Sequence, residues 1–488
     1  MSKVLLINPA EFETKYTKAP SLNRMVFPPL GLAYIAAVLE ENGHKVSILD
    51  APPLQIKEKQ LMETVRKTKP DIVGIQAYTS AIYQAKTAAE CIKQEYPDTT
   101  VVFGGHHPTF MPDDTLKMSK SIDYLVRGEG EYTFLKLTEA LENGTNGKKL
   151  KDIKGISFRS NGAVVNTPDA DFIKDLDALP FPARHLLPMD EYHYFGARRE
   201  MQSLLSSRGC PFKCRFCAVG AYYKNVWRPR SAKNVVDEME QIREKFGIRA
   251  IAVMDDMATF SKRRIRNICQ DIRERDLDIY WGTVSRVDTM DFETLKLMAK
   301  SRCLQVLVGV ESGSERVLQN SHKGISLQQI EQFFIWCKKL GMDTVASVVF
   351  GLPGDTKESL QETLWFIKKL NPGVAVFSAA TPYPGTPFWD EAKQNGWLPK
   401  ETKWSDLNMY DPVLNTNEIT KEELEDFIQF AYLKFRGPKW GMQRLYNDFR
   451  YTQKIHGFLG AIRVPPLTVR LFVRWFREKS RGKTFDGS

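Results

Sequence analysis

The stretch RGCPFKCRFCAVG, residues 208–220, contains three of the seven cysteines of this chain. Cys210, Cys214 and Cys217 lie within eight residues, too close together for a disulfide framework. Thiolates are soft ligands that suit zinc or an iron–sulfur cluster. A closed structural zinc site takes four protein ligands, and no fourth Cys lies nearby in the sequence. The stretch therefore predicts a metal centre held by three thiolates, with one coordination position left for another molecule.

Two other interpretations of these cysteines remain open at this point. A catalytic zinc site also uses three protein ligands, and three thiols can simply pack in a core. The loop is polar, because Arg208, Lys213 and Arg215 lie among the cysteines. Positive neighbours favour the thiolate form, so metal binding is the preferred interpretation. The odd number of cysteines indicates a reducing compartment.

The cysteine stretch opens a repeating pattern of strands and helices over about residues 202–387. Apolar runs of strand length alternate with stretches such as SAKNVVDEMEQIREKFG, which predicts parallel strands joined by helices. The predicted strands are 203–206, 251–254, 280–284, 305–309, 344–350 and 374–380. Such units form an open barrel or a flat sheet, and we prefer the barrel. The cysteine loop follows the first strand, at the end where barrels carry their chemistry.

The first 135 residues show the same alternation. Their predicted strands are 4–8, 45–50, 72–76, 100–103 and 124–126. Each is followed by a polar or glycine-bearing loop, among them QAYTSA, GGHHPT and RGEGE. In an open α/β sheet, ligands bind beyond the carboxyl ends of the strands. The loops therefore define one candidate site. In any single loop the glycines are better explained as turn residues, but five such loops in register favour a site.

A connector separates the two series. It is predicted to hold a hairpin over residues 155–165 with SNG as its turn, and its prolines, Pro180, Pro182 and Pro188, are typical of a linker. The sequence thus predicts four regions. They are an open α/β domain at 1–145, a linker with the hairpin at 146–195, the barrel at 196–400 and a basic helical region at 401–488.

The net charge of +10 is concentrated at the end of the chain. Thirteen Lys and Arg and three acidic residues lie between Lys434 and Ser488, so this tail alone carries +10. A capped helix is expected from about Thr420. Farther on, the helically spaced arginines of an amphipathic segment are Arg470, Arg474, Arg477 and Arg481. That segment suits either an anionic membrane surface or docking on the barrel with its arginines in water, and both interpretations stay open.

The composition is that of a folded globular protein. The 488 residues are 42% hydrophobic and 26% charged, and no run of about eighteen uncharged apolar residues is long enough to cross a bilayer. The first residues, MSKVLLINPAEFE, have too short an apolar run for a signal peptide. These features predict a cytoplasmic protein, peripheral at the inner face of the membrane if the tail binds lipid.

The cysteine spacing, with Phe216 before the last cysteine, resembles the signature of the radical S-adenosylmethionine (radical SAM) family. The six βα units resemble the partial barrel of that family. The resemblance implies a 4Fe-4S cluster on Cys210, Cys214 and Cys217, with one open iron that binds S-adenosylmethionine. The residues that it implies as further contacts to S-adenosylmethionine are Phe216, Asp255, Asp256, Arg286, Glu311, Gly351 and Tyr383.

The first domain resembles the cobalamin-binding module that precedes the barrel in a large radical SAM subgroup. The segments GGHHPTFMPDD and YLVRGEGE carry this resemblance, which extends over roughly residues 1–400. The implied cobalamin contacts are Tyr78, Thr79, Ser80, Gly104, Gly105, His106, Gly128 and Glu129. The Asp-x-His-x-x-Gly sequence that supplies an axial histidine in the mutases is absent from the chain. Cobalamin is therefore expected to bind without a histidine on its lower face.

The resemblance implies an α/β protein with three parts. These are a Rossmann-like doubly wound cobalamin-binding domain, a partial (β/α)6 radical SAM barrel and a mainly helical C-terminal region. The activity that it implies begins when a 5′-deoxyadenosyl radical takes hydrogen from an unactivated carbon, and methylcobalamin then donates a methyl group. The expected partners are a hydrophobic substrate, such as a lipid, terpenoid or tetrapyrrole, and an electron donor such as flavodoxin or ferredoxin.

Two alternative activities are considered. AIYQAKTAAECIKQEYPD and VRGEGE are similar to segments of the anaerobic magnesium-protoporphyrin monomethyl ester cyclase, so oxidation or ring closure is the main alternative. RNA methylthiolation is a remote one, prompted by the basic charge. Enzymes of that kind carry a second cluster on three N-terminal cysteines, whereas only Cys91 precedes residue 210 here. No nucleic-acid partner is therefore expected.

Overall fold

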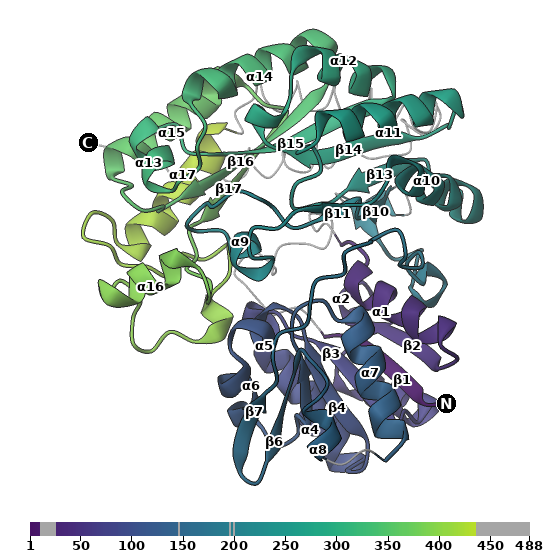
Figure 1. Ribbon diagram of the computed structural model, residues 1–488. Helices are drawn as coiled ribbons and strands as arrows, with labels where there is room; N and C mark the ends of the chain where they lie inside the picture. Colours follow the sequence, from purple (N-terminus) through teal and green to yellow (C-terminus); the bar gives the residue numbers. More distant parts are fainter. Residues whose placement is uncertain (10–25, 145–146, 195–196, 199–200, 436–488) are drawn as a thin grey trace.

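The computed structural model describes residues 1–9, 26–144, 147–194, 197–198 and 201–435. These residues form two α/β units, which lie one above the other in Figure 1. The N-terminal unit is built on a seven-stranded sheet and the barrel unit on a six-stranded sheet. The short helix α9 (Ala218–Tyr222) lies between them.

The N-terminal sheet has the strand order β2-β1-β3-β4-β5-β6-β7. Its strands are β1 (Lys3–Asn8), β2 (Lys45–Asp50), β3 (Ile72–Gln76), β4 (Thr100–Gly104), β5 (Tyr124–Val126), β6 (Ile156–Ser160) and β7 (Ala163–Asn166). The first five are parallel to one another, and β6 and β7 pair antiparallel. The strand order reverses between β1 and β3, and loops beside such a switch point bind ligands.

Helices cover both faces of this sheet. The helices of the unit are α1 (Leu30–Glu41), α2 (Ala51–Leu54), α3 (Glu58–Thr68), α4 (Ile82–Glu95), α5 (His106–Phe110), α6 (Pro112–Met118), α7 (Glu131–Glu142) and α8 (Gly147–Leu150). Along β1, Val4 and Leu6 pack with α1 and α7, whereas Leu5 and Ile7 pack with α3 and α4. Successive side chains of a strand point to opposite faces, so the doubly wound arrangement is confirmed.

The predicted hairpin is present, and it belongs to the N-terminal sheet. Strands β6 and β7 are joined through Asn161 and Gly162, whose φ angles are 49° and 79°. Two left-handed residues at a two-residue turn are the type I′ geometry that suits a hairpin. Because β6 also pairs with β5, the hairpin extends the first unit instead of standing alone in the connector.

The barrel unit has six parallel strands in the order β10-β13-β14-β15-β16-β17, so each strand lies beside the next one in the sequence. They are β10 (Met201–Leu204), β13 (Ala250–Val253), β14 (Tyr280–Ser285), β15 (Cys303–Glu311), β16 (Asp343–Phe350) and β17 (Val374–Ala379). The connecting helices are α10 (Ala232–Phe246), α11 (Lys262–Glu274), α12 (Phe292–Lys300), α13 (Glu315–Asn320), α14 (Leu327–Leu340) and α15 (Lys357–Leu370). The longer ones, α10, α11, α12, α14 and α15, cover the outside of the sheet (Figure 1). The predicted partial barrel is confirmed.

The end of the described chain is helical. It contains α16 (Pro387–Gln394), a short 3-10 turn at Trp404–Asp406 and α17 (Lys421–Phe435), which packs on β17. The Glu423 N–H donates to Thr420 Oγ1 at 3.2 Å, and the Thr420 N–H donates to Glu423 Oε2 at 3.0 Å. This reciprocal cap begins α17 where the sequence predicts it. The basic tail, with its predicted amphipathic helix, lies outside the described residues.

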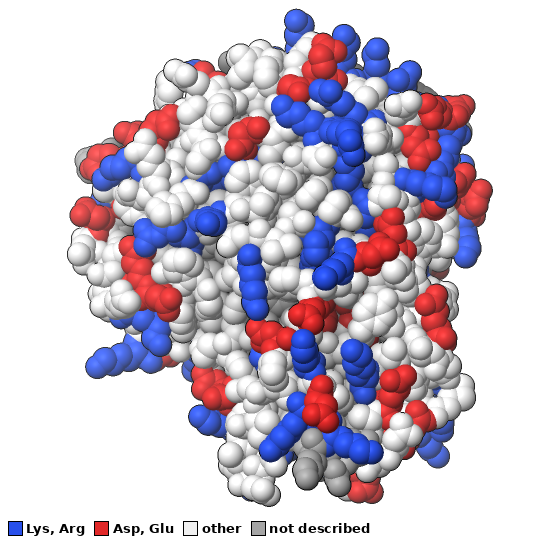
Figure 2. Space-filling model, in the orientation of Figure 1, with Lys and Arg blue, Asp and Glu red and all other residues white. Residues whose placement is uncertain are grey.

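Charges of both signs are mixed over the face shown in Figure 2. This agrees with the sequence, in which the residues before the basic tail carry no net charge. None of the helices in the described ranges has the length and apolar character needed to cross a membrane.

Candidate functional site

The cysteine loop leaves the carboxyl end of β10. Gly209, immediately before Cys210, has a φ of 80°, and a side chain there would overlap the Val226 carbonyl. Only glycine suits such a position. The Cys217 N–H donates to the Cys214 carbonyl at 3.2 Å, and α9 begins directly after Cys217. The three thiols are half-buried on this one loop.

The two predicted carboxylates, Asp255 and Asp256, both act on this loop. Buried Asp255 accepts from the Ser206 N–H and hydroxyl at 2.6 Å each and from the Ser207 hydroxyl at 2.5 Å, so its oxygens are used within the protein. The Asp256 residue is exposed to solvent and accepts from the Gly209 N–H at 3.0 Å. Desolvation of its carboxyl by the surrounding protein raises the pKa of Asp256 to about 6. Asp256 is thus the better placed of the two for a ligand, and contact with S-adenosylmethionine stays a prediction for both.

Two basic side chains of the loop are paired with carboxylates. Arg208 lies 2.9 Å from Glu129 and 2.5 Å from Glu131, and Arg215 lies 3.0 Å from Glu391. Opposite charges in such pairs offset each other. The loop is therefore less basic than its sequence indicates.

This pairing changes the expected state of the thiols. Burial raises the pKa of Cys210 and raises the pKa of Cys217 to about 11. For Cys210 and Cys217, burial therefore opposes the thiolate form that the basic neighbours are expected to favour. A metal ion deprotonates a coordinating thiol by itself, so the raised pKa values do not oppose a ligand role.

Arg286 and Glu311 lie at the carboxyl ends of the neighbouring strands β14 and β15, on the side of the cysteine loop. Arg286 Nη1 is 3.9 Å from Cys214 Sγ. Glu311 Oε1 accepts from Lys323 Nζ at 2.6 Å, and both side chains are buried. Burial alone opposes the charge on Lys323, but Glu311 and Cys214 hold its pKa above the ordinary value. Sequence analysis missed Lys323, because nothing in its segment distinguishes it from the many exposed lysines.

Phe216 and Tyr383 pack against one apolar cluster around Phe388. Burial raises the pKa of Tyr383 to about 12. Gly351 lies in the turn after β16 with a φ of 84°, and its N–H donates to Asp355 Oδ2 at 2.9 Å. The structure thus places both aromatic residues against one apolar cluster and gives Gly351 a turn position. Cofactor contacts of all three stay predictions.

The residues predicted to contact cobalamin lie on three loops at the carboxyl edge of the N-terminal sheet. They are Tyr78, Thr79 and Ser80 after β3, Gly104, Gly105 and His106 at the end of β4, and Gly128 and Glu129 after β5. The His106 ring stacks on Tyr78 with 5.6 Å between centroids and contacts Tyr222 at 4.5 Å. Tyr222 belongs to α9, and its hydroxyl donates to the Gly128 carbonyl at 2.6 Å. The loops after β4 and β5 therefore meet the helix that follows the cysteines, and the loop after β3 joins them through His106.

At this edge of the sheet, a glycine turn lies near buried polar atoms that have no hydrogen-bond partner among the described residues. Gly105 has a φ of 113°, and a Cβ there would lie 3.0 Å from the Ala77 carbonyl oxygen. His107 is fully buried with Nδ1 3.3 Å from Thr79 Oγ1. Its Nε2, like Gln76 Oε1, has no hydrogen-bond partner among the described residues. Buried polar atoms are normally satisfied, so these atoms indicate a ligand or ordered water at this edge.

Glu129 differs from the other predicted cobalamin residues, because its carboxylate is already paired. It lies 2.9 Å from Arg208 and 2.8 Å from Arg228, and none of these side chains is more than 10% exposed. Although burial alone would raise it, the two arginines hold the pKa of Glu129 below its ordinary value. Arg208 is two residues from Cys210, so Glu129 ties the N-terminal unit to the cysteine loop.

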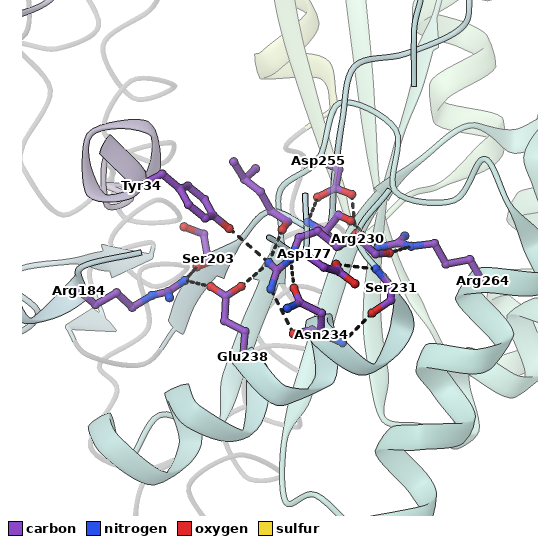
Figure 3. A network of polar contacts seen from close by, with 12 residues as sticks. Tyr34, Asp177, Arg184, Ser203, Arg230, Ser231, Asn234, Glu238, Asp255 and Arg264 are labelled. Carbon is purple, nitrogen blue, oxygen red and sulfur yellow. Dashed lines mark hydrogen bonds and ion pairs between the residues drawn. The ribbon is translucent and has the colours of Figure 1, made fainter. Parts of the chain in front are cut away.

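A second buried contact between the units centres on Glu238 of α10 (Figure 3). Its carboxylate lies 2.6 Å from Arg184 Nη2 and also accepts from Arg230. Arg230 Nη1 donates to the Tyr34 hydroxyl of α1 at 3.3 Å. Arg184 donates to the Ser203 carbonyl of β10 at 2.8 Å. We call these four ionisable residues the Glu238 network; it joins the N-terminal unit, the connector and the strand before the cysteine loop.

Comparison with known proteins supplies two family matches. The B12 binding domain matches residues 24–138, and the Radical SAM superfamily matches residues 204–367. An uncharacterized methyltransferase of Pyrococcus horikoshii is 38% identical over 408 residues, covering 84% of this chain and 87% of that protein. The anaerobic magnesium-protoporphyrin IX monomethyl ester cyclase of Rubrivivax gelatinosus is 31% identical over 413 residues, covering 84% of this chain and 74% of that protein.

A solved structure has the same architecture. The cobalamin-dependent S-adenosylmethionine radical enzyme OxsB, with aqua-cobalamin and S-adenosylmethionine bound, matches with a TM-score of 0.73 at 17% identity. The match covers 98% of this chain and 75% of that chain. Fold and family matches together define a radical SAM enzyme with a cobalamin-binding domain. Within that class, the chain belongs to the family that includes the Pyrococcus methyltransferase and the Rubrivivax cyclase.

The cofactors of this class are a 4Fe-4S cluster, S-adenosylmethionine and cobalamin, and the residues present fit them. Among the described residues, no three Cys, His, Asp or Glu side chains are grouped to hold a single metal ion. A cluster has no need of such a group, since each thiolate binds a different iron. The Gly105 turn and the unpartnered His107 and Gln76 atoms fit a large ligand at the carboxyl edge of the first sheet. Family membership excludes the zinc interpretation.

Proposed function

We propose that the protein methylates an unactivated carbon of a hydrophobic substrate. The methyltransferase relative is 38% identical and the cyclase relative 31% identical, over the same share of this chain. This difference favours methyl transfer over oxidation or ring closure. The substrates that we consider are lipids, terpenoids and tetrapyrroles.

The proposal that the substrate is hydrophobic is supported by a set of exposed apolar side chains in the loops around the site. They are between 38% and 47% exposed and comprise Tyr78, Val226, Met254, Phe260, Met409 and Tyr410. Tyr78 follows β3, Met254 follows β13, and the Met409 carbonyl accepts from the last N–H of β17 at 2.9 Å. These are the carboxyl ends of strands, where ligands of both fold types bind. Apolar surface gathered at such a place indicates an apolar ligand.

The apolar surface continues into the cysteine loop. Phe260 meets Trp227 edge to face with 5.1 Å between centroids, and it meets Phe212 in the same manner at 6.1 Å. Phe212 lies between Cys210 and Cys214. A substrate resting on Phe260 would therefore lie beside the cluster ligands.

In this proposal the residues of the chain bind the cofactors and the substrate, orient them and shield them from water. When bound, the cluster with S-adenosylmethionine supplies hydrogen abstraction from carbon, and cobalamin supplies the methyl group. Cys210, Cys214 and Cys217 hold the cluster, and Asp256 offers a carboxylate to the amino group of S-adenosylmethionine. The apolar side chains exclude water, which protects reactive species from side reactions. A low-potential one-electron donor, such as flavodoxin or ferredoxin, is the proposed protein partner.

The radical reaction is tested on the full chain, reconstituted without oxygen with iron, sulfide and cobalamin. After reduction and addition of S-adenosylmethionine, mass spectrometry should detect 5′-deoxyadenosine. Cys214→Ala should abolish it together with the cluster absorbance. Cys91→Ala, at a half-buried thiol of α4, is the matched control and should keep both. Absence of 5′-deoxyadenosine from the unaltered protein would exclude the radical mechanism.

Product mass separates the two reaction outcomes. Hydrophobic candidates from the three substrate classes are incubated with the active enzyme, and a gain of one CH2 supports methylation. Loss of hydrogen or gain of oxygen would instead support the cyclase alternative. S-adenosylmethionine with a deuterated methyl group shows whether the added carbon comes from it.

A further inference from the structure

Arg286 is held in a way that leaves one nitrogen for the cysteine loop. Its Nε and Nη2 donate to the two Asp288 oxygens at 2.9 Å each, and Nη2 also donates to the Lys323 carbonyl at 2.7 Å. Nη1 lies 3.9 Å from Cys214 Sγ. A guanidinium binds a carboxylate best through two parallel donors, and Asp288 already occupies that pair. Arg286 is therefore better placed to serve the cysteine sulfur than the carboxylate of S-adenosylmethionine.

Stacking fixes the plane of the same guanidinium. The Arg286 Cζ atom lies 3.6 Å from the centroid of the Phe212 ring, a close cation–π contact. Phe212 belongs to the loop segment between Cys210 and Cys214, and Phe260 supports its ring from the edge. Hydrogen bonds on one side and an aromatic face on the other leave the Nη1 atom little freedom to turn away from sulfur.

A second buried cation, Lys323, lies in the segment that holds Arg286. Lys323 and Glu311 are less than 10% exposed, and Glu311 has a left-handed φ of 61°. The pairing of β15 with β16 is irregular between Gly309 and Glu311, and a side chain at Gly309 would overlap the Glu311 carboxylate. Strained backbone persists where the surroundings enforce it, often at functional sites. The Lys323 backbone carbonyl accepts from Arg286 Nη2 at 2.7 Å, so this segment also holds Arg286 in place.

We propose that Arg286, supported by Lys323, is a positioning residue that makes the bound cluster easier to reduce. Reduction adds one electron from an external one-electron donor, and no bond forms or breaks at the protein. Added negative charge on the cluster is stabilised by an N–H donor to sulfur. Asp288 and Glu311 offset the net charges of Arg286 and Lys323, so the expected effect comes from the Nη1 donor directed at Cys214. The two carboxylates, Asp288 and Glu311, lie on the cations and hold them in place. The inference depends on the cluster and not on methyl transfer.

The test is a reductive titration of the reconstituted full chain, with the reduced cluster followed by electron paramagnetic resonance. Arg286→Met keeps the side-chain length and removes the charge and donors. Its one-electron reduction constant should fall by about tenfold, which corresponds to about 59 mV. Arg286→Lys keeps the positive charge but not the paired donors of the guanidinium, and its reduction constant should fall less. Arg249→Met is the matched control, since Arg249 precedes β13 at the opposite end of the sheet and pairs with Asp278; its constant should not change.

A reduction constant of Arg286→Met within about twofold of the unaltered protein, at equal iron and sulfide content, overturns the proposal. If this variant holds no cluster, the reduction constant of Arg286→Lys is the test. An unchanged constant in Arg286→Lys would also overturn the proposal. Lys323→Met should lower the constant in the same direction. The titration needs neither cobalamin nor substrate. A protein that shows the Arg286 effect but transfers no methyl group therefore keeps this inference and loses the proposed function.

Discussion

Two groups of buried charges, the Glu238 network and the group beside Cys214, are built differently. In the Glu238 network, each cation is directed at the central carboxylate (Figure 3). The members come from α1, the connector, the segment just before α10 and the middle of α10. In the group beside Cys214, the pairs are local: Arg286 with Asp288, and Lys323 with Glu311. One Arg286 nitrogen there is directed at sulfur instead of a carboxylate.

This difference in partners shows that buried ion pairs have two roles in this protein, one in stability and one beside the cluster ligands. A closed network that joins distant segments fixes where the units lie, and it offers nothing to a ligand. A group with one donor turned outward can act on what the neighbouring loop binds. Changes in the Glu238 network should therefore alter stability, whereas changes beside Cys214 should alter the cluster more than the fold.

Glu238→Gln is expected to have the largest effect on stability. It leaves Arg184 and Arg230 buried without their carboxylate, and breaking a buried pair in this way costs about 3–5 kcal/mol. Arginine cannot escape by losing its proton. The free energy of unfolding, from urea titrations followed by circular dichroism, should fall by about that amount.

Glu311→Gln is the matched substitution in the other group. The substitution leaves Lys323 buried without its carboxylate, but the pKa of a buried lysine can fall until the side chain is neutral. The loss of unfolding free energy should therefore be smaller than for Glu238→Gln. Equal losses in the two variants would remove the distinction between the groups.

Glu129→Gln is expected to be next in size, because Glu129 bridges two arginines between the N-terminal unit and the cysteine loop. Arg208 keeps Glu131, and Arg228 keeps the Ile173 carbonyl at 2.6 Å. With these partners left, the loss should be about 2 kcal/mol, in the range of hydrogen bonds to charged groups. Urea unfolding measures it, and the iron content after reconstitution shows whether the loop also loses its cluster. Full stability of this variant would mean that the bridge contributes nothing to the contact between the units.

A pH-dependent contribution of similar or smaller size is expected from Asp50, at the end of β2. Its buried carboxyl accepts from the Tyr192 hydroxyl at 2.6 Å and from Asn8 at 2.8 Å, and burial raises its pKa to about 6. The folded chain thus holds this proton more tightly than the unfolded chain, whose Asp pKa is about 3.9. Stability from this group is present at low pH and is lost as pH rises through 6, by about 2 kcal/mol between pH 4 and 7.

Asp50→Asn keeps the size of the side chain and one of its two accepting oxygens, and it removes the titration. The difference in unfolding free energy between the two proteins should therefore change with pH in the direction just given. Parallel stability curves would show that Asp50 binds its proton equally in the folded and unfolded chains.

The order of elements could be predicted from the sequence because it depends on local patterns. Alternating strands and helices placed every parallel strand of both sheets, and Thr420 with Glu423 marked the start of α17. The cysteine spacing gave the cluster ligands directly, since all three lie on one loop. Loop positions at the carboxyl ends of strands followed from topology alone.

The partners of charged side chains could not be predicted, because they depend on segments that meet only in the folded chain. Glu129 is predicted as a cobalamin residue, but it meets Arg208 and Arg228, which lie 79 and 99 residues away. The adjacent Asp255 and Asp256 look equivalent in the sequence, yet one is buried under two serines and the other stays beside the loop. The roles of Asp255 and Asp256 thus differ because of burial and hydrogen-bond partners, and not because of residue type.

Tyr34→Phe should have the smallest effect, because Tyr34 lies at the edge of the Glu238 network. Its hydroxyl accepts from Arg230 at the long distance of 3.3 Å, and Arg230 keeps Glu238 and the Leu205 carbonyl when that bond is lost. Its ring, which Phe retains, lies under Arg208 with 5.3 Å from Cζ to the centroid. The unfolding free energy should fall by about 1 kcal/mol, and cluster content should not change. Tyr34→Ala also removes the ring and should cost more; a loss in Tyr34→Phe as large as in Glu238→Gln would make the hydroxyl an essential member of the network.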